Sequence, residues 1–191
     1  MKPQSKLTIA IGAAALLALL LGGTALYAQS KPNAGPVSAS DKYSLLSPSG
    51  VAFAEFKGYE DWSVVSSART DEVLKVIVAN PIMIQAYKSG IPGNGQPFPE
   101  GAKIAKLQWK FKRSTEAPFV VDVPDVFSQV FLMEKNTSRF PKTGGWGYAL
   151  FDYDATHDTF TADPTGVSDC GNACHVKVSA KDRIFHPYQK R

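Results

Sequence analysis

The segment from Ala102 to Lys112 restricts the fold more than any other part of the sequence. Its tract KLQWKFK (residues 106–112) alternates polar and apolar side chains, and this period of two predicts a strand with one apolar and one polar face. The backbone groups of such a strand need neighbouring strands to complete their hydrogen bonds. We therefore expect the chain to fold around a β-sheet.

Other segments predict more strands than helices. Asn80 and Pro81 supply a cap and a first-turn proline, so a short helix is expected at Ile82–Ser89, before an irregular loop at Gly90–Gly101. A helical pattern returns at Ser168–Val178. Further strands are expected at Asp71–Val78, Val126–Lys135 and Trp146–Tyr153. The expected fold class is α+β: a predominantly antiparallel β-sheet with a few short helices in a single domain.

The N-terminal residues have the pattern of an export signal. Lys2 and Lys6 precede an apolar run from Leu7 to Ala28, and small residues occupy the positions where cleavage would occur. If the run is not cleaved, it is long enough to anchor the chain in a bilayer. We expect residues 1–28 to be a signal peptide or such an anchor, which places the folded part in the periplasm or otherwise outside the cytoplasm.

The rest of the chain is sized for one domain. Residues 29–40 are rich in Ser, Pro, Ala and Gly and predict a flexible spacer, so the domain is expected at residues 41–191. Of the 21 basic residues two lie in the leader, which leaves 19 against 17 acidic residues. With no long basic block, this balance gives no reason to expect nucleic acid binding.

Both cysteines lie in the tract CGNACH, which ends at His175. In an exported protein a Cys170–Cys174 disulfide is the default outcome. A zinc site would need further ligands, and His157 and His186 have no suitable spacing. A thioredoxin-like pair would need two intervening residues instead of three. Covalent haem uses all three residues, because the thiols can bond to the two vinyl groups while the adjacent imidazole binds iron.

The spacing between the two cysteines is one residue longer than in the ordinary haem attachment sequence. Gly171 and Asn172 tolerate unusual backbone conformations, so a widened helical turn can absorb the additional residue. Covalent haem and the disulfide therefore both stay open from the residues alone.

Three longer tracts are similar to one protein family. They are NPIMIQAYKSGIPGNGQPFPEGAKIAK (residues 80–106), GGWGYALFDYD (144–154) and CGNACHVKVSAKDRIFHPY (170–188). Through them the chain resembles the cytochrome P-460 family, to which cytochrome c-prime-beta also belongs, from about Tyr43 to Arg191. The resemblance implies a predominantly β domain with one c-type haem, His175 as its proximal iron ligand, and an opposite face open to small molecules.

The resemblance also implies a role for Lys106. In hydroxylamine-oxidising members a lysine side chain is bonded to the porphyrin, and Lys106 stands at the matching position. A lysine that alternates with apolar residues on a strand is ordinarily solvated. Ile104, on the same predicted face, indicates that this face is not wholly exposed to water. Lys103 is the nearby alternative, but it shares a face with Leu107.

The substrate side of the haem is less clearly implied. Oxidising members keep a carboxylate there, which would act as general base. The matching position is Phe131, whose ring would form an apolar pocket that admits nitric oxide or carbon monoxide. Glu134 is a weaker candidate for a proton relay, because it has the opposite strand parity. Met133 could supply a sixth iron ligand, although a methionine on a strand is usually core packing.

The expected function is that of an exported monohaem c-type cytochrome. It would oxidise hydroxylamine at a five-coordinate haem iron and pass electrons to a soluble acceptor such as another cytochrome. Two alternatives stay open: a cytochrome that binds nitric oxide or carbon monoxide without turnover, and a haemless domain with a disulfide. A homodimer is a further expectation. Trp146, Tyr148 and Phe151 are expected to be core residues without chemistry.

Overall fold

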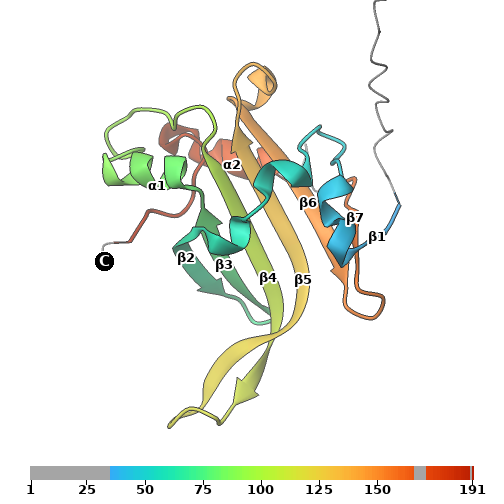
Figure 1. Ribbon diagram of the computed structural model, residues 1–191. Helices are drawn as coiled ribbons and strands as arrows, with labels where there is room; N and C mark the ends of the chain where they lie inside the picture. The colour runs from blue at the N-terminus through green and yellow to red at the C-terminus, as the bar shows by residue number, and fades with distance from the viewer. Residues whose placement is uncertain (1–34, 166–170, 190) are drawn as a thin grey trace, which may run out of the picture. The chain divides into compact units, whose positions relative to one another are not determined.

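Seven strands of the described residues form one antiparallel sheet (Figure 1). The computed structural model describes residues 35–165, 171–189 and 191, so the expected signal peptide and Cys170 lie outside the described residues. The strand order is β1-β7-β6-β5-β4-β3-β2. The strands are β1 (Val37–Ser38), β2 (Ser63–Arg69), β3 (Val73–Ala79), β4 (Lys103–Ser114), β5 (Val121–Lys135), β6 (Trp146–Asp154) and β7 (Thr159–Ala162). The expected fold class is confirmed.

The helical elements are short. Helix α1 (Pro81–Lys88) begins after Asn80, whose side chain accepts a hydrogen bond from the Met83 N–H at 3.0 Å, as the predicted cap requires. The other helical elements are η1 (Ala39–Ser44), η2 (Phe53–Phe56), η3 (Tyr59–Asp61), η4 (Pro141–Thr143), α2 (Ala173–His175) and η6 (Val176–Lys181). Among the described residues, no helix is long and apolar enough to cross a membrane.

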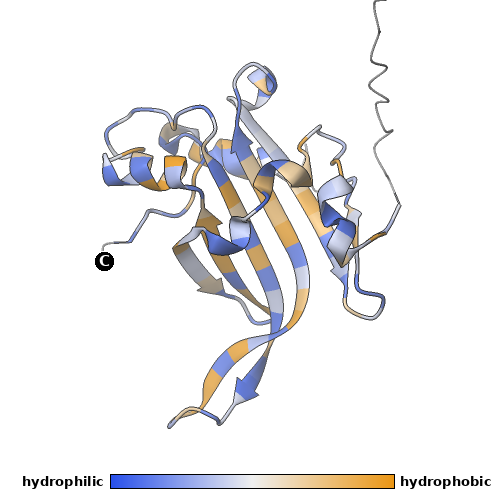
Figure 2. Cartoon of the chain, in the orientation of Figure 1, coloured by the Kyte–Doolittle hydropathy of each residue, from blue (hydrophilic) through white to orange (hydrophobic). Residues whose placement is uncertain are grey.

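The sheet has two buried faces, and hydropathy alternates along its central strands (Figure 2). One face packs against the N-terminal turns η1, η2 and η3, with Phe53, Phe56 and Phe151 fully buried. The other face packs against α1 and the C-terminal segment and contains Met83, Trp146 and Ile184. Figure 1 shows these two layers, with η1 to η3 in front of the sheet and α2 behind it. The central strands β3, β4, β5 and β6 therefore contribute alternate residues to two separate cores.

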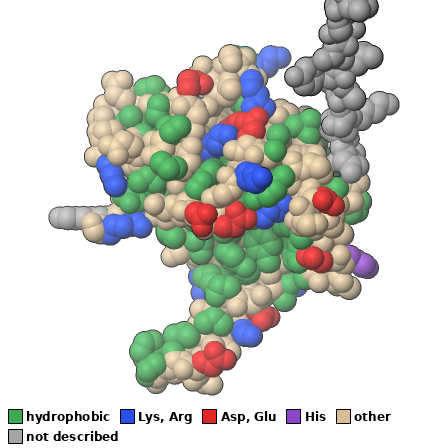
Figure 3. All heavy atoms as spheres, viewed as in Figure 1, with side chains coloured by type: hydrophobic (Ala, Val, Ile, Leu, Met, Phe, Trp, Pro, Cys, Tyr) green, Lys and Arg blue, Asp and Glu red, His purple; other side chains and the backbone are tan. Residues whose placement is uncertain are grey.

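Three parts of the fold differ from the sequence-based expectation. Strand β5 begins five residues earlier than predicted, because Val121 pairs with Ser114 in a hairpin that extends past β3 and β6. Phe119 near the hairpin end is 72% exposed, and Figure 3 shows hydrophobic side chains gathered there. The edge strand β2 was not predicted, because its sequence SVVSSAR is largely polar. Val37 is buried and pairs with Phe160, so strand β1 lies within the expected spacer.

Candidate functional site

A cavity of about 400 Å³ lies on the face of the sheet that also packs against α1. This volume is within the range of small-molecule and cofactor pockets. Strands β4, β5 and β6 form one wall, and α2 with the chain after it contributes the facing residues. The lining residues that matter for chemistry are Ile104, Lys106, Phe131, Tyr148, Cys174 and His175.

His175 is fixed in orientation by three contacts. Its Nδ1 lies 2.6 Å from the backbone carbonyl oxygen of Arg183, which can only accept, so Nδ1 carries the proton. The ring centroids of Tyr148 and Phe185 lie 5.2 and 4.8 Å from the imidazole centroid. Burial lowers the pKa of His175, and the nearby Lys106 and Arg183 charges act in the same direction. The neutral imidazole therefore has Nε2 free to bind a metal ion.

Cys174 precedes this imidazole and lines the same cavity. Gly171 and Asn172 before it form a wide, π-helical turn, as expected for a motif with one additional residue. A β-carbon on Gly171 would lie 2.8 Å from Cβ and Cγ of Tyr148, so only glycine fits here without a shift of the tyrosine. Of the two thiols, the described residues therefore place only that of Cys174 at the cavity.

Lys106 lies on the sheet wall of the cavity, where it pairs in register with Phe131 on β5. Its Nζ is 3.6 Å from the centroid of the Phe131 ring. Burial lowers the pKa of Lys106 to about 8, with a smaller contribution from the positive charge of Lys75. Lys103 lies on the opposite face, where its Nζ donates to the Glu55 carbonyl at 2.7 Å. Of these two lysines on β4, only Lys106 lines the cavity.

A comparison with known protein families identifies the family of this chain. Residues 56–186, more than half of the chain, match the family model described as Cytochrome P460. The chain belongs to the cytochrome P460 family. No curated protein matches the chain.

Membership in the cytochrome P460 family implies a haem cofactor, and the residues of the cavity fit one. An imidazole with one nitrogen hydrogen-bonded and the other free is suited to an axial iron ligand. The adjacent Cys174 thiol is suited to a thioether bond, and the lining is largely apolar. Phe131 and Met133 both line the cavity, while Met133 is also part of the core behind it.

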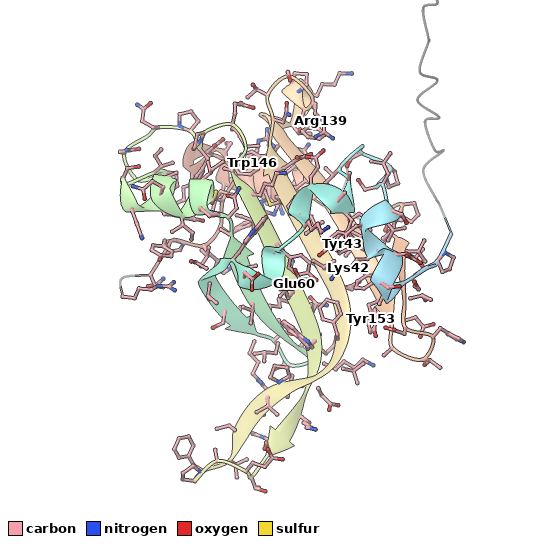
Figure 4. The ribbon with its side chains drawn as sticks, in the orientation of Figure 1. Lys42, Tyr43, Glu60, Arg139, Trp146 and Tyr153 are labelled. Atoms are coloured by element: carbon pink, nitrogen blue, oxygen red, sulfur yellow. The ribbon has the colours of Figure 1, made fainter. Side chains whose placement is uncertain are left out.

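Glu134 does not line the cavity, which corrects the expected proton relay. Its side chain is 3% exposed, and its carboxylate accepts a hydrogen bond from Arg139 Nη1 at 2.7 Å. The same nitrogen lies 3.0 Å from the Glu55 carboxylate, on the face of the sheet opposite the cavity. Figure 4 labels Arg139 at the β5–β6 connection. Strand parity accounts for the position, because residues 131 and 134 on one strand point to opposite faces. Glu134 instead joins β5 to the N-terminal turns.

This buried carboxylate predicts a pH-dependent stability. Burial, together with the neighbouring Glu55, raises the pKa of Glu134 from 4.5 to about 7. The folded chain therefore binds more protons than the unfolded chain between these values, so stability decreases as pH rises. We expect the free energy of unfolding, measured by urea denaturation, to decrease by about 1–3 kcal/mol more in the wild type than in Glu134→Gln over this interval. Parallel pH profiles for the two proteins would contradict this assignment.

The structure also adds residues to the site that the sequence did not indicate. Tyr148 is a core residue, as expected, but it also packs against His175 and lines the cavity. Its buried hydroxyl makes no hydrogen bond to the described residues. Burial raises the pKa of Tyr148 to about 12. His186 is exposed, as expected, but it also lines the cavity. Tyr148 and Leu150 are two residues apart on one strand, so their side chains lie on the same face of the sheet. This pattern indicates a role for Tyr148 only when that face is known to form the cavity.

Proposed function

We propose that this member of the cytochrome P460 family is a monohaem c-type cytochrome that oxidises hydroxylamine and passes the electrons to an external acceptor. The observation that carries the proposal is that Lys106, Cys174 and His175 line one cavity. A haem bound through a thioether to Cys174, bonded at the porphyrin to Lys106 and ligated at iron by His175 would require these three residue types. Electrons from hydroxylamine would go to the acceptor and its protons to water.

Each residue would have a separate task. Cys170 and Cys174 would hold the haem through thioether bonds, and His175 would bind the iron through Nε2. Bound haem would supply a redox-active iron with one coordination position open to the substrate. The Arg183 carbonyl keeps the imidazole proton on Nδ1, and the rings of Tyr148 and Phe185 limit its rotation. The apolar lining limits the access of water to the reacting atoms.

Lys106 is chemically suited to bond to the porphyrin. A nucleophilic amine must be neutral. With a pKa of about 8, roughly a tenth of the Lys106 side chains are neutral at pH 7, far more than for a solvated lysine. The contact of Nζ with the face of the Phe131 ring reduces the neutral fraction, because the ring face attracts the charged amine. Such a bond would change the electronic properties of the porphyrin, which in turn supports substrate oxidation.

A second function is favoured by a different observation. Among the described residues that line the cavity there is no Asp or Glu, and the apolar Phe131 stands at the position where the family resemblance implied a carboxylate. An apolar pocket of this kind is suited to nitric oxide or carbon monoxide, which bind iron without proton transfer. The alternative is therefore a gas-binding cytochrome without turnover.

Steady-state assays with hydroxylamine and an artificial electron acceptor distinguish the two functions. We expect the purified protein to be coloured, to keep its haem through acid-acetone extraction, and to reduce the acceptor only when hydroxylamine is present. Carbon monoxide binding to the reduced protein serves as the control for an accessible iron. Binding of carbon monoxide without acceptor reduction would exclude the oxidase and support the gas-binding protein. A colourless protein, two hydrogens lighter than the reduced chain, would support the Cys170–Cys174 disulfide.

A further inference from the structure

We propose that Asp182 and Lys135 are positioning residues for His175, because they hold the backbone carbonyl to which its imidazole donates. This inference rests on the proposed function only in taking His175 as the iron ligand. Neither residue lines the cavity, so both would act through the turn that follows η6. Three features support this role: the turn itself, a buried ion pair, and a link to the haem-attachment segment.

The turn has an unusual backbone. Asp182 and Arg183 have φ values of 46° and 65°, which places two consecutive residues with side chains in the left-handed region. Residues other than glycine rarely adopt this conformation, and they keep it only where surrounding contacts impose it. The result is that the Arg183 carbonyl oxygen lies 2.6 Å from His175 Nδ1. Whatever stabilises this turn therefore also determines the hydrogen bond to the imidazole.

A buried ion pair stabilises the turn. Lys135 Nζ donates to the two carboxylate oxygens of Asp182 at 2.8 and 3.0 Å, and the Phe98 N–H donates to the same carboxylate at 2.7 Å. The Lys135 side chain is only 4% exposed, and its Nζ lies 5.2 Å from the centroid of the Trp146 ring, labelled in Figure 4. Removing one partner of such a pair leaves the other charge buried and unpaired. Asp182 is therefore held from two sides, by β5 and by the loop before β4.

The Arg183 side chain connects the turn to the haem-attachment segment. Its Nη1 donates to Asn172 Oδ1 at 2.5 Å, within the CGNACH tract. The guanidinium passes close to Gly144, where a β-carbon would lie 2.5 Å from Arg183 Nε. Lys135 Nζ also donates to the Gly144 carbonyl at 3.0 Å. The ion pair and the attachment segment are thus both connected to the turn whose Arg183 carbonyl contacts the imidazole.

The physical consequence concerns the donor strength of His175. A hydrogen bond from Nδ1–H to a carbonyl makes the other ring nitrogen more basic and fixes the ring orientation. A stronger donor stabilises the oxidised iron, so the strength of this bond is one control on the reduction potential. If the turn relaxes, the bond lengthens, and the imidazole becomes a weaker ligand.

The proposal is tested with Asp182→Ala, Asp182→Asn and Lys135→Met in the haem-containing protein. We expect Asp182→Ala to lower the iron–histidine stretching frequency in the resonance Raman spectrum of the reduced protein and to raise its midpoint potential. Lys135→Met should change both quantities in the same direction. Asp182→Asn should restore most of the wild-type values, because asparagine tolerates a left-handed backbone and its amide oxygen can accept from Lys135 and Phe98.

Arg139→Gln is the matched control. Glu134 is adjacent to Lys135 in the sequence but lies on the face away from the cavity, and Arg139→Gln removes the nearer of its two cationic partners. This variant should therefore destabilise the fold without changing the stretching frequency or the potential. Unchanged values in Asp182→Ala and Lys135→Met would overturn the positioning role while leaving the haem assignment intact, and so would equal shifts in Arg139→Gln.

A colourless wild type would instead refute the proposed function, and the positioning role would then be tested by nitrogen-15 NMR of the haem-free chain. We expect the His175 proton to reside on Nδ1 in the wild type and in Asp182→Asn. Asp182→Ala should lose this tautomer preference. An identical tautomer in all three proteins would overturn the positioning role independently of haem.

Discussion

Replacing His175 by alanine is expected to lower hydroxylamine-dependent acceptor reduction by at least about 100-fold, since loss of residues that only support a metal ligand already costs 10–100-fold. The haem should stay attached, because thioether bonds to Cys170 and Cys174 do not involve the imidazole. The described residues that line the cavity include a second histidine, His186, but it lacks the Nδ1 hydrogen bond and ring contacts that orient His175. The variant is measured by acceptor reduction and by the spectrum of the reduced protein.

His157→Ala is the control for this experiment. His157 is exposed and pairs with Asp154 at 2.6 Å in the turn between β6 and β7, and it does not line the cavity. The His157→Ala variant should therefore keep both the spectrum and the activity of the wild type. A His175→Ala protein with an unchanged spectrum would show that this imidazole is not the iron ligand, and the site assignment would be wrong.

The second large effect is expected at Lys106. If its amine is bonded to the porphyrin, the wild type has a broad, red-shifted Soret band, and Lys106→Met converts it to that of an ordinary c-type cytochrome. Peptide mapping by mass spectrometry should find the peptide of β4 joined to the haem peptide in the wild type and separate in the variant. Hydroxylamine-dependent acceptor reduction should decrease in parallel, because the altered ring is part of the proposed oxidase.

Lys103→Met is the matched control for the bond, because Lys103 lies on the same strand but on the opposite face. It should leave the Soret band and the peptide map unchanged. A Soret band that is the same in the wild type and in Lys106→Met would show that no bond forms. Together with carbon monoxide binding and no acceptor reduction, that result would favour the gas-binding function.

The prediction of the strands succeeded where the local sequence signal was clear. β3, β4 and β6 lie within two residues of their predicted positions at each end: β3 is rich in β-branched residues, β4 alternates polar and apolar side chains, and β6 follows the glycines at 144 and 145. Helix α1 was equally well marked by Asn80 and Pro81. The prediction failed for β2, whose sequence is largely polar, and for the short strand β7. It also failed for the hairpin before residue 126, where pairing between two strands extends beyond the rest of the sheet.

Some features of the candidate site were likewise predictable from local sequence, and others were not. The adjacency of Cys170, Cys174 and His175 is a property of the chain itself, so the sequence alone suggested their common chemistry. Strand parity likewise separates Lys106 from Lys103, because residues an odd number of positions apart lie on opposite faces. Strand parity also separates Glu134 from Phe131. In contrast, the ion pairs of Glu134 and Glu55 with Arg139 join separate parts of the chain, so no local pattern indicated them.

The sequence by itself therefore determined which residue types are adjacent and which side chains share a face of a strand, because both follow from covalent spacing and the period of the backbone. Only the tertiary structure decided which distant segment covers each face. It places the Arg183 carbonyl against His175, Asp182 against Lys135, and the Lys106 amine in the cavity that also contains Cys174. Such contacts arise from packing and charge pairing across the fold, and no local pattern encodes them.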